Sequence, residues 1–475
     1  MYRRAKIVAT LGPASSNESA IRELIQAGMN VARINFSHGA QAEHAVVIAT
    51  IRRIAREMGQ PVTILQDLQG PKIRTGEIED GSINLQKGQK LTLTIEPILG
   101  TSDQVSVDYD KLPESASMGE RILLDDGNLE LEVVSITPTG VETRVTLGGV
   151  LKPHKGVNLP GASLNIQSFT EKDRQDLIFG LSQNVDAIAL SFVRSAQDII
   201  NLRDEIQRID SSKTEIPIIA KLERPEALDN LHEILHVVDG VMVARGDLGV
   251  ELPPQRVPIE QKRIIHLANR HLKVVITATQ MLESMMNNPR PTRAEASDVA
   301  NAIFDGSDLV MLSGETAVGQ YPVKAVETMA DIIHEAEEHM AEWGHFDTVL
   351  SEDISHEDAL YITRAARELA FNRQVAAIAV FTISGRTARM MSKARPGVPI
   401  LAFTTQPTTL RKMSMYWGVR PFIVPHVDTV EDMLEQVRRT ITESTELQPG
   451  QEVVLVAGFP IGAMRSANFL LLHEV

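Results

Sequence analysis

The chain has 475 residues, of which 43% are hydrophobic and 23% charged, and this composition is typical of a folded globular protein. At roughly 150 residues per domain, the length predicts about three domains. The chain contains no cysteine, which excludes disulfides, thiolate catalysis and cysteine-ligated zinc or iron–sulfur sites. Lysine and arginine number 47 against 62 aspartates and glutamates, so the formal net charge of −15 argues against nucleic acid or an anionic membrane as the main partner.

The first residues resemble the start of a secretory signal for only a few positions. Arg3 and Arg4 precede an apolar run over residues 7–9, but Gly12 and Pro13 end that run before an adequate hydrophobic segment forms. No apolar stretch elsewhere approaches the roughly 18 residues of a membrane-spanning helix. We therefore predict that the chain begins with a strand, does not enter a membrane and is cytoplasmic.

From residue 5 to about residue 314, eight short apolar runs alternate with amphipathic segments that have the period of a helix. The runs are Lys6–Leu11, Val31–Phe36, Val62–Leu68, Ala187–Val193, Pro217–Leu222, Gly240–Ala244, Val274–Ala278 and Leu309–Leu312. Strands that alternate with helices predict a parallel sheet, and eight such units close naturally into a (β/α)8 TIM barrel. A doubly wound open sheet remains the alternative on the pattern alone.

The crossover between Leu68 and about Ser168 has a different pattern, because its apolar residues alternate with polar ones at period two. Lys90–Ile95 and Leu129–Val134 show this alternation, and residues 125–128 (Asp-Asp-Gly-Asn) are a turn signal between strands. We predict a small all-β domain inserted after the third barrel strand.

A long helical pattern follows the eighth strand over Val323–Glu342, and a third region begins at about Phe346. Its apolar runs again alternate with helices, and they are Ala377–Thr382, Ile400–Phe403, Phe422–Val424 and Val453–Ala457. This pattern predicts a separate C-terminal α/β domain. The predicted limits are 1–69 with 169–345 for the barrel, 70–168 for the inserted domain and 346–475 for the C-terminal domain.

Polar and charged side chains lie where several predicted barrel strands end, and the active sites of such barrels form at that rim. Residues two apart in a strand share a face, so Arg33, Asn35 and Ser37 point together. Lys221 and Glu223 form a second pair of this kind. The other strand-end groups are Asp67, Arg245-Gly246-Asp247, Thr277-Ala278-Thr279-Gln280 and Ser313-Gly314-Glu315-Thr316.

Any one of these residues alone has a plain interpretation as a solvated strand cap. A single rim that supplies an arginine, a lysine and three acids is harder to explain in that way, because burying them without partners is unfavourable. Together they predict an anionic substrate and a hard metal ion. Glu223 and Asp247 offer carboxylate oxygens from neighbouring strands, which favours Mg²⁺ or Mn²⁺ with water and substrate in the remaining positions.

Six segments closely resemble signature segments of the pyruvate kinase family and follow that family's order over essentially the whole chain. They are residues 33–39 (RINFSHG), 155–161 (KGVNLPG), 221–223 (KLE), 242–249 (MVARGDLG), 279–285 (TQMLESM) and 291–295 (PTRAE). The resemblance implies a barrel, a small β-barrel lid inserted after strand three and a C-terminal α/β domain. It also implies a homotetramer that transfers the phosphoryl group of phosphoenolpyruvate to ADP, giving pyruvate and ATP, in the last step of glycolysis.

The resemblance further assigns a role to each rim residue. The implied substrate-binding residues are Arg33, Lys221, Gly246, Asp247 and Thr279. Among these, the implied catalytic residues are Arg33, Lys221 and Thr279, the last of which would organise a proton donor for the enolate. The implied Mg²⁺ (or Mn²⁺) ligands are Glu223 and Asp247. The residues implied to face the nucleotide are Asn35, His38, Arg74 and Lys155.

Many members of the family also bind K⁺. The residues that match that site are Asn35, Ser37, Asp67 and the backbone carbonyl of Leu68. Those members usually carry glutamate where this chain has Lys72, whose ammonium group carries the charge needed to replace the ion. Leu68 and Gln69 also resemble the K⁺-independent group, whereas Thr75 resembles the other group. We predict activity that does not require K⁺.

The C-terminal domain contains a run of hydroxyls and backbone amides before a helix, an arrangement that makes a good phosphate cradle. The family binds sugar-phosphate effectors at the matching place, and the implied effector residues are Thr382, Ser384, Gly385, Arg386 and Thr387. An ordinary helix N-cap explains the same residues equally well from the sequence alone. Gly458–Asn468 matches the family's closing loop only loosely, so the identity of the effector stays open.

Two other functions remain as alternatives. A barrel aldolase or lyase would use Lys221 to form a Schiff base with a 2-oxo acid. Glu223 argues against it, because a nearby carboxylate raises the pKa of a lysine. A non-catalytic effector-binding protein is the second alternative, and the complete set of rim ligands argues against that one.

Overall fold

The computed structural model describes residues 3–161, 167–344, 358–460 and 466–475. Its central domain is a closed barrel of eight parallel strands, which meet in the order β1-β2-β3-β12-β13-β14-β15-β16. The strands are β1 (Lys6–Leu11), β2 (Met29–Asn35), β3 (Thr63–Asp67), β12 (Ala187–Leu190), β13 (Ile218–Leu222), β14 (Gly240–Ala244), β15 (Val274–Ala278) and β16 (Leu309–Leu312). The predicted barrel is therefore confirmed, and the doubly wound open sheet is excluded.

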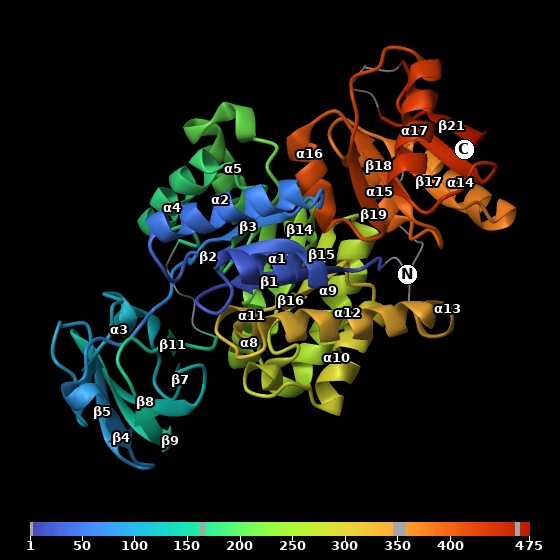
Figure 1. Cartoon of the computed structure of the whole chain (residues 1–475). Helices are drawn as coiled ribbons and strands as arrows, with labels where there is room; N and C mark the ends of the chain where they lie inside the picture. The colour runs from blue at the N-terminus through green and yellow to red at the C-terminus, as the bar shows by residue number, and fades with distance from the viewer. Residues whose placement is uncertain (1–2, 162–166, 345–357, 461–465) are drawn as a thin grey trace.

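Helices surround the barrel (Figure 1), and residues of every barrel strand pack with them in one hydrophobic cluster. The principal ones are α1 (Glu18–Ala27), α2 (Gln41–Glu57), α4 (Glu171–Ser182), α5 (Ala196–Ile209), α7 (Leu231–Val237), α9 (Val257–Arg270), α10 (Arg293–Phe304) and α12 (Pro322–Glu338). In β1, Ile7 and Ala9 pack in the cluster shared with the helices, while Val8 belongs to the cluster that fills the barrel. Both faces of the strand are thus apolar, which explains why these strands read as continuous hydrophobic runs.

The crossover after β3 forms an all-β domain, as the period-two pattern predicts. Its curled six-stranded sheet has the order β11-β7-β8-β9-β5-β6, and β10 pairs with β4 beside it. The strands are β4 (Ile83–Leu85), β5 (Lys90–Thr94), β6 (Gln104–Ser106), β7 (Arg121–Leu124), β8 (Leu129–Thr137), β9 (Gly140–Leu147), β10 (Gly149–Leu151) and β11 (Val157–Asn158). Asp125, Asp126 and Gly127 all have positive φ in the β7–β8 turn, which is typical of a tight hairpin.

The C-terminal domain is a five-stranded sheet of order β19-β18-β17-β20-β21 with helices on its faces. Its elements are α14 (Asp358–Arg373), β17 (Ala377–Phe381), α15 (Arg386–Lys393), β18 (Ile400–Thr404), α16 (Pro407–Lys412), β19 (Val419–Ile423), α17 (Val430–Ser444), β20 (Glu452–Ala457) and β21 (Phe469–Glu474). The antiparallel strand β21 is absent from the predicted set. It contains no β-branched residue, so its strand structure depends on pairing with β20 rather than on local preference.

The predicted domain limits stay predictions, and the one at residue 346 lies outside the described residues. The long helix predicted over 323–342 is divided at His339 into α12 and the short α13 (Met340–Trp343). Among the helices described, none has both the length and the apolar character needed to cross a membrane.

Three aspartates join the C-terminal domain to the barrel at the N-terminal ends of its strands. Asp186, Asp239 and Asp308 directly precede β12, β14 and β16, which are alternate strands of the barrel. Each accepts a backbone N–H from the neighbouring strand segment, and the donors are Ile64, Ile218 and Val275, at 2.8, 3.1 and 2.8 Å. Each also pairs with cations of the C-terminal domain, namely Arg411, Arg389 and the pair Lys393 with Arg395.

We predict that Asp308→Asn lowers the free energy of unfolding by about 3 kcal/mol, because it leaves two buried cations without their counter-charge. The side chains of Asp308, Lys393 and Arg395 are only 1%, 2% and 5% exposed. The measurement is the midpoint of urea unfolding followed by circular dichroism. Glu327→Gln is the matched control, because its pair with Lys324 is exposed and contributes no more than about 0.5 kcal/mol. Equal midpoints for the two variants would contradict the prediction.

Candidate active site

Four of the predicted rim residues form one continuous chain of ion pairs at the C-terminal ends of β2, β3 and β13. The Nε of Arg33 lies 2.6 Å from Oδ2 of Asp67, whose Oδ1 lies 3.3 Å from Nζ of Lys221. The same ammonium lies 2.9 Å from Oε1 of Glu223. The two carboxylates are buried, while the two cations keep about a tenth of their side-chain surface exposed, at 11% and 12%. The structure therefore brings together the residues that the sequence predicts to meet.

The charges in this chain control one another's protonation. Burial alone would lower the pKa of Lys221, but Asp67 and Glu223 outweigh it and hold that pKa above its ordinary value. Burial would raise the pKa of Asp67, but Lys221 and Arg33 hold it below its usual range. Burial raises the pKa of Glu223, and the nearby negative charge of Asp247 adds to that rise. The result is an ammonium group that stays charged at the rim of the barrel.

Two residues after β12 complete the surroundings of Lys221, and the sequence pattern did not identify them. Ser191 accepts a hydrogen bond from Nζ of Lys221 at 2.8 Å and donates one to the carbonyl of Leu68 at 2.6 Å. Phe192 has φ 54°, and its N–H donates to Oε2 of Glu223 at 2.8 Å. The predicted strand Ala187–Val193 includes both residues because Phe192 and Val193 are apolar, whereas the structure ends β12 at Leu190.

Thr279 follows β15 with a left-handed backbone, at φ 75°. The guanidinium of Arg245 donates to the carbonyl of Thr279 at 2.6 Å and pairs with Asp298 at 2.7 Å, so it holds this turn in place. A Cβ on Gly246 would lie 2.7 Å from Cγ2 of Thr279, and the close contact therefore requires glycine. The sequence identified Arg245 only as one of several strand-end residues. Its role in positioning Thr279 follows from its hydrogen bond to the Thr279 carbonyl.

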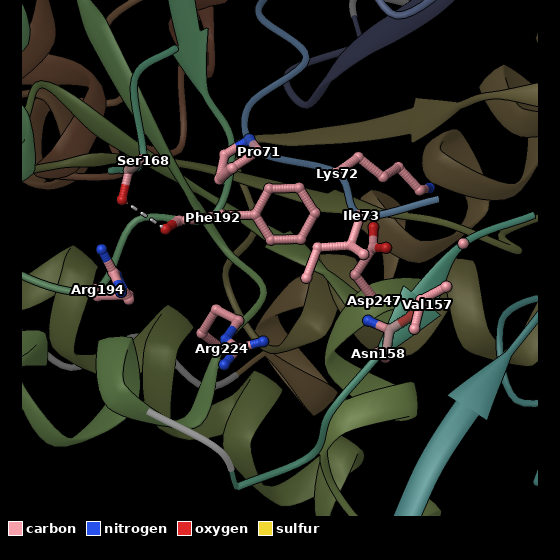
Figure 2. Close-up of a pocket in the computed structure, with 11 residues that line it drawn as sticks. Pro71, Lys72, Ile73, Val157, Asn158, Ser168, Phe192, Arg194, Arg224 and Asp247 are labelled. Atoms are coloured by element: carbon pink, nitrogen blue, oxygen red, sulfur yellow. Dashed lines mark hydrogen bonds between the residues drawn. The ribbon is translucent and has the colours of Figure 1, made fainter. Parts of the chain in front are cut away.

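Gly246 and Asp247 lie in the first turn of α8 (Arg245–Glu251), the short helix that directly follows β14. Together with Thr279 they line a cavity of about 970 Å³, which is large enough for a substrate of metabolite size. A smaller pocket adjoins it. Figure 2 shows that pocket, where Asp247, Lys72 and Phe192 lie with Val157 and Asn158 of the inserted domain. The inserted domain thus forms one wall of the site.

The predicted nucleotide side of the rim is strongly cationic. The pKa of His38 is lowered first by burial and then by the positive charges of Arg74 and Lys72. Arg74 also donates to the carbonyl of His154 at 3.0 Å. Lys155 lies on the inserted domain and pairs with Asp125 at 2.7 Å, so its nucleotide role stays a prediction. A neutral histidine beside two cations suits the approach of a polyphosphate.

The residues predicted for a K⁺ site lie close together, although their groups are already engaged. Asn35 is the register partner of Asp67 on the adjacent strand, and its Oδ1 accepts the N–H of Ser37 at 3.1 Å. The carboxylate of Asp67 is neutralised by two protein cations, as described above. Lys72 lines the large cavity and makes no hydrogen bond or ion pair with any residue that the structure describes.

Glu223 and Asp247 fit a divalent cation as a pair. The pKa of Glu223 is raised first by burial and further by the negative charge of Asp247, and a bound cation would relieve that repulsion. Within the described part of the chain, no group of three or more histidine, aspartate or glutamate side chains is arranged to hold a metal. As metal ligands, Glu223 and Asp247 would supply two carboxylates, with the other positions left to water and substrate.

The predicted effector residues form the loop before α15. Thr382 accepts the N–H of Gly385 at 3.0 Å, and Ser384 accepts the N–H of Arg386 at 3.4 Å. Gly385 has φ 84°, which suits the turn into the helix. These contacts are those of an ordinary helix cap, and the effector role of the loop stays a prediction.

A TIM barrel with paired cations and carboxylates at its rim, and with a cavity walled by an inserted domain, defines an enzyme that acts on anionic substrates. Two family models match the chain: "Pyruvate kinase, barrel domain" over residues 2–326 and "Pyruvate kinase, alpha/beta domain" over residues 361–473. The chain belongs to the pyruvate kinase family.

Individual relatives agree with that assignment. The pyruvate kinase of Geobacillus stearothermophilus is 47% identical over 480 residues, which cover the whole of this chain and 81% of the relative. That of Mycobacterium tuberculosis is 43% identical over 478 residues, covering 100% of this chain and 99% of the relative. A crystal structure of a pyruvate kinase from Cryptosporidium parvum has a TM-score of 0.91 and 35% identity, over 99% of this chain and 96% of that one.

These similarities establish the reaction. The chain is a phosphotransferase that moves the phosphoryl group of phosphoenolpyruvate to ADP, giving pyruvate and ATP in the last step of glycolysis. The aldolase alternative also fails on the chemistry of the site, because a Schiff base needs a neutral amine and the pKa of Lys221 is raised.

Proposed function

We propose that Lys221 and Arg33 act directly on the phosphoryl group during its transfer. The observation that carries this proposal is the ammonium of Lys221, which Asp67 and Glu223 hold charged and fixed at the rim of the barrel. Phosphoryl transfer passes through a loose transition state, in which charge is spread over the oxygens of the moving group. Fixed cations stabilise that charge without having to reorganise, so they lower the barrier rather than only binding the substrate.

The metal in this proposal is Mg²⁺, or Mn²⁺, held by Glu223 and Asp247. When bound, a divalent cation neutralises charge on the phosphoryl oxygens and on the enolate oxygen that is left behind. Phe192 contributes by donating its N–H to the second oxygen of Glu223, which fixes the orientation of that carboxylate. Gly246 gives the carboxylate end of phosphoenolpyruvate room to approach Thr279, because no Cβ stands between them.

The second half of the reaction is a proton transfer to carbon. The bond from phosphorus to the enol oxygen breaks, a bond forms to an oxygen of ADP, and the enolate takes a proton at its terminal carbon. The hydroxyl of Thr279 is too weak an acid to supply that proton alone, and we propose that it orients a water that does. Arg245 keeps the hydroxyl in place through its bond to the Thr279 carbonyl.

The nucleotide would approach from the inserted domain. We propose that the nucleotide-facing residues are Asn35, His38, Arg74 and Lys155. The cationic surroundings of His38 support this role, since ADP carries several negative charges. The inserted domain already lines the smaller pocket through Val157 and Asn158, so a small movement of that domain would enclose the nucleotide.

We predict that Lys221→Met lowers kcat by about 10²- to 10³-fold, because it removes a fixed charge that acts on the transition state. The measurement is a coupled assay of pyruvate formation from phosphoenolpyruvate and ADP, with and without Mg²⁺. Lys324→Met is the matched control, since Lys324 is exposed on α12 and lines neither of the two active-site pockets. A variant at position 221 with the activity of the control would refute the proposed role.

We predict that turnover in K⁺-free tetramethylammonium buffer is comparable to turnover in K⁺ buffer. The physical reason is the ammonium of Lys72, which can supply the positive charge that the ion would bring. The measurement compares kcat in the two buffers at equal ionic strength. A large requirement for K⁺ would show that Lys72 does not replace the ion.

We propose that a sugar phosphate activates the enzyme through Thr382, Ser384, Gly385, Arg386 and Thr387. The loop lies at the start of α15, where backbone amides and hydroxyls can hold a phosphate. We predict that the double variant Ser384→Ala with Thr387→Ala loses this activation while its basal activity is kept. Velocity at low phosphoenolpyruvate, measured across a panel of sugar phosphates, tests the idea. An unchanged response to every compound would refute the proposed effector role of this loop.

We also propose a homotetramer and a cytoplasmic location, both of which rest on membership of the family. Light scattering of the purified chain measures its mass in solution and tests the first of these. A mass of one chain, 52.2 kDa, would contradict it.

A further inference from the structure

The carboxylates of Glu223 and Asp247 are held in different ways, although both are proposed to bind the same metal ion. Glu223 is fixed through its own two oxygens, which contact Nζ of Lys221 at 2.9 Å and the N–H of Phe192 at 2.8 Å. The carboxylate of Asp247 makes no hydrogen bond or ion pair with any residue in the described ranges. The position of Asp247 therefore depends on how its helix, α8, is placed.

The short helix α8 is anchored at both of its ends. Arg245, its first residue, donates to the carbonyl of Thr279, as described above. Glu251, its last residue, forms an ion pair with Arg224, whose Nη1 lies 2.8 Å from Oε1 of the carboxylate. Asp247 lies about one turn before Glu251, so the two side chains share a face of the helix.

Arg224 connects this second anchor to the other proposed metal ligand, because it directly follows Glu223 in the chain. It also precedes α6 (Pro225–Asp229) as the N-cap residue, at the point where the chain leaves β13. The pair is buried, since only 6% of the arginine side chain and 1% of the Glu251 side chain are exposed. Water does not compete for these groups, so their geometry is closely defined. The pair therefore joins the segment that carries Glu223 to the helix that carries Asp247.

The surroundings of Glu251 make this anchor specific. Nδ2 of Asn158, in the inserted domain, donates to the same Oε1 at 3.3 Å. Burial raises the pKa of Glu251, and the negative charges of Glu226 and Asp247 raise it further, while Arg224 and the Asn158 hydrogen bond act in the opposite sense. Glu251 thus depends on Arg224 for its charge balance, and the two residues act as a unit.

We propose that Arg224 and Glu251 are positioning residues for the metal. Their ion pair holds α8 against the end of β13, so that the two metal-binding carboxylates face one cation. Arg224, Asn158 and Asp247 line the same small pocket (Figure 2). The inference rests on the proposed metal role of Glu223 and Asp247, and it adds the contact that sets the separation of these two ligands.

The test measures Mn²⁺ binding to the full-length enzyme without substrates, from the electron paramagnetic resonance signal of free Mn²⁺. We expect Glu251→Ala to weaken Mn²⁺ binding about tenfold, the effect of removing a group that orients a ligand. Glu251→Gln should stay within about threefold of the unaltered chain, because its amide oxygen still accepts hydrogen bonds. Arg224 then keeps Glu226 as a counter-charge.

Glu337→Ala is the matched control. It also removes a buried carboxylate, but one that accepts the backbone N–H groups of Arg4 and Ala5, at the end of the barrel opposite the rim. This variant should bind Mn²⁺ as the unaltered chain does. Asn158→Ala should do the same, because it leaves the ion pair with α8 intact.

The possible failures can be told apart. Equal Mn²⁺ binding by Asp247→Ala and the unaltered chain would refute the proposed metal role itself. Weakened binding by Asp247→Ala together with unchanged binding by Glu251→Ala would refute only the positioning role. A loss in Glu251→Gln as large as that in Glu251→Ala would assign the effect to charge rather than to position, and an equal loss in Asn158→Ala would assign it to the inserted domain. Either result overturns the proposal.

Urea unfolding checks that each variant is folded. If Glu251→Ala does not fold, the double variant Arg224→Met with Glu251→Met decides, because apolar residues of similar volume often replace a buried ion pair without loss of stability. Mn²⁺ binding that is about tenfold weaker in this folded double variant supports the positioning role. Binding equal to that of the unaltered chain overturns it.

Discussion

The active site depends on the ion pairs that hold the ammonium of Lys221 between Asp67 and Glu223. A lysine buried in this position without those acids would tend to lose its proton, since burial disfavours the charged form. The two carboxylates prevent that, and each carries a partner of its own in Arg33 and the Phe192 N–H. Removing one of these charged groups therefore changes the protonation of the others, in addition to breaking its own contact.

Barrel closure is what brings these groups together from distant parts of the chain. Asp67 ends β3 and Lys221 lies in β13, and only β12 stands between them in the sheet. The inserted domain occupies the sequence between β3 and β12, so it emerges beside the charged group and can cover it. The topology of the barrel therefore places the insertion point and the charged residues at the same rim.

The two ends of the barrel use charge in different ways. At the C-terminal ends of the strands, the cations of Arg33 and Lys221 keep a small exposed surface, so their charge is available to a substrate. At the N-terminal ends, Asp308 with Lys393 and Arg395 is sealed between two domains, where the same kinds of groups fix one domain to the other.

The sequence predicts the barrel strands well because both of their faces are buried, which gives a continuous apolar signal. It also predicts that Arg33, Lys221 and Glu223 share a rim, since strand alternation and barrel geometry are regular. Ser191 and Phe192 could not be found in this way, because a turn that ends a strand early is imposed by a distant carboxylate. Local preference contains no information about that contact.

Gly246 is another residue whose identity cannot be explained by local sequence preference. Its backbone is not left-handed, so nothing in its own conformation demands glycine. Glycine is required because the methyl group of Thr279 lies only 2.7 Å from the position that a Cβ would take. Thr279 itself has φ 75°, and Arg245 donates a hydrogen bond to its carbonyl. The arginine that precedes the glycine therefore creates the contact that the glycine accommodates. These two adjacent residues and Thr279 form one steric unit, and a substitution at any of the three would displace the hydroxyl that we propose to act on the substrate.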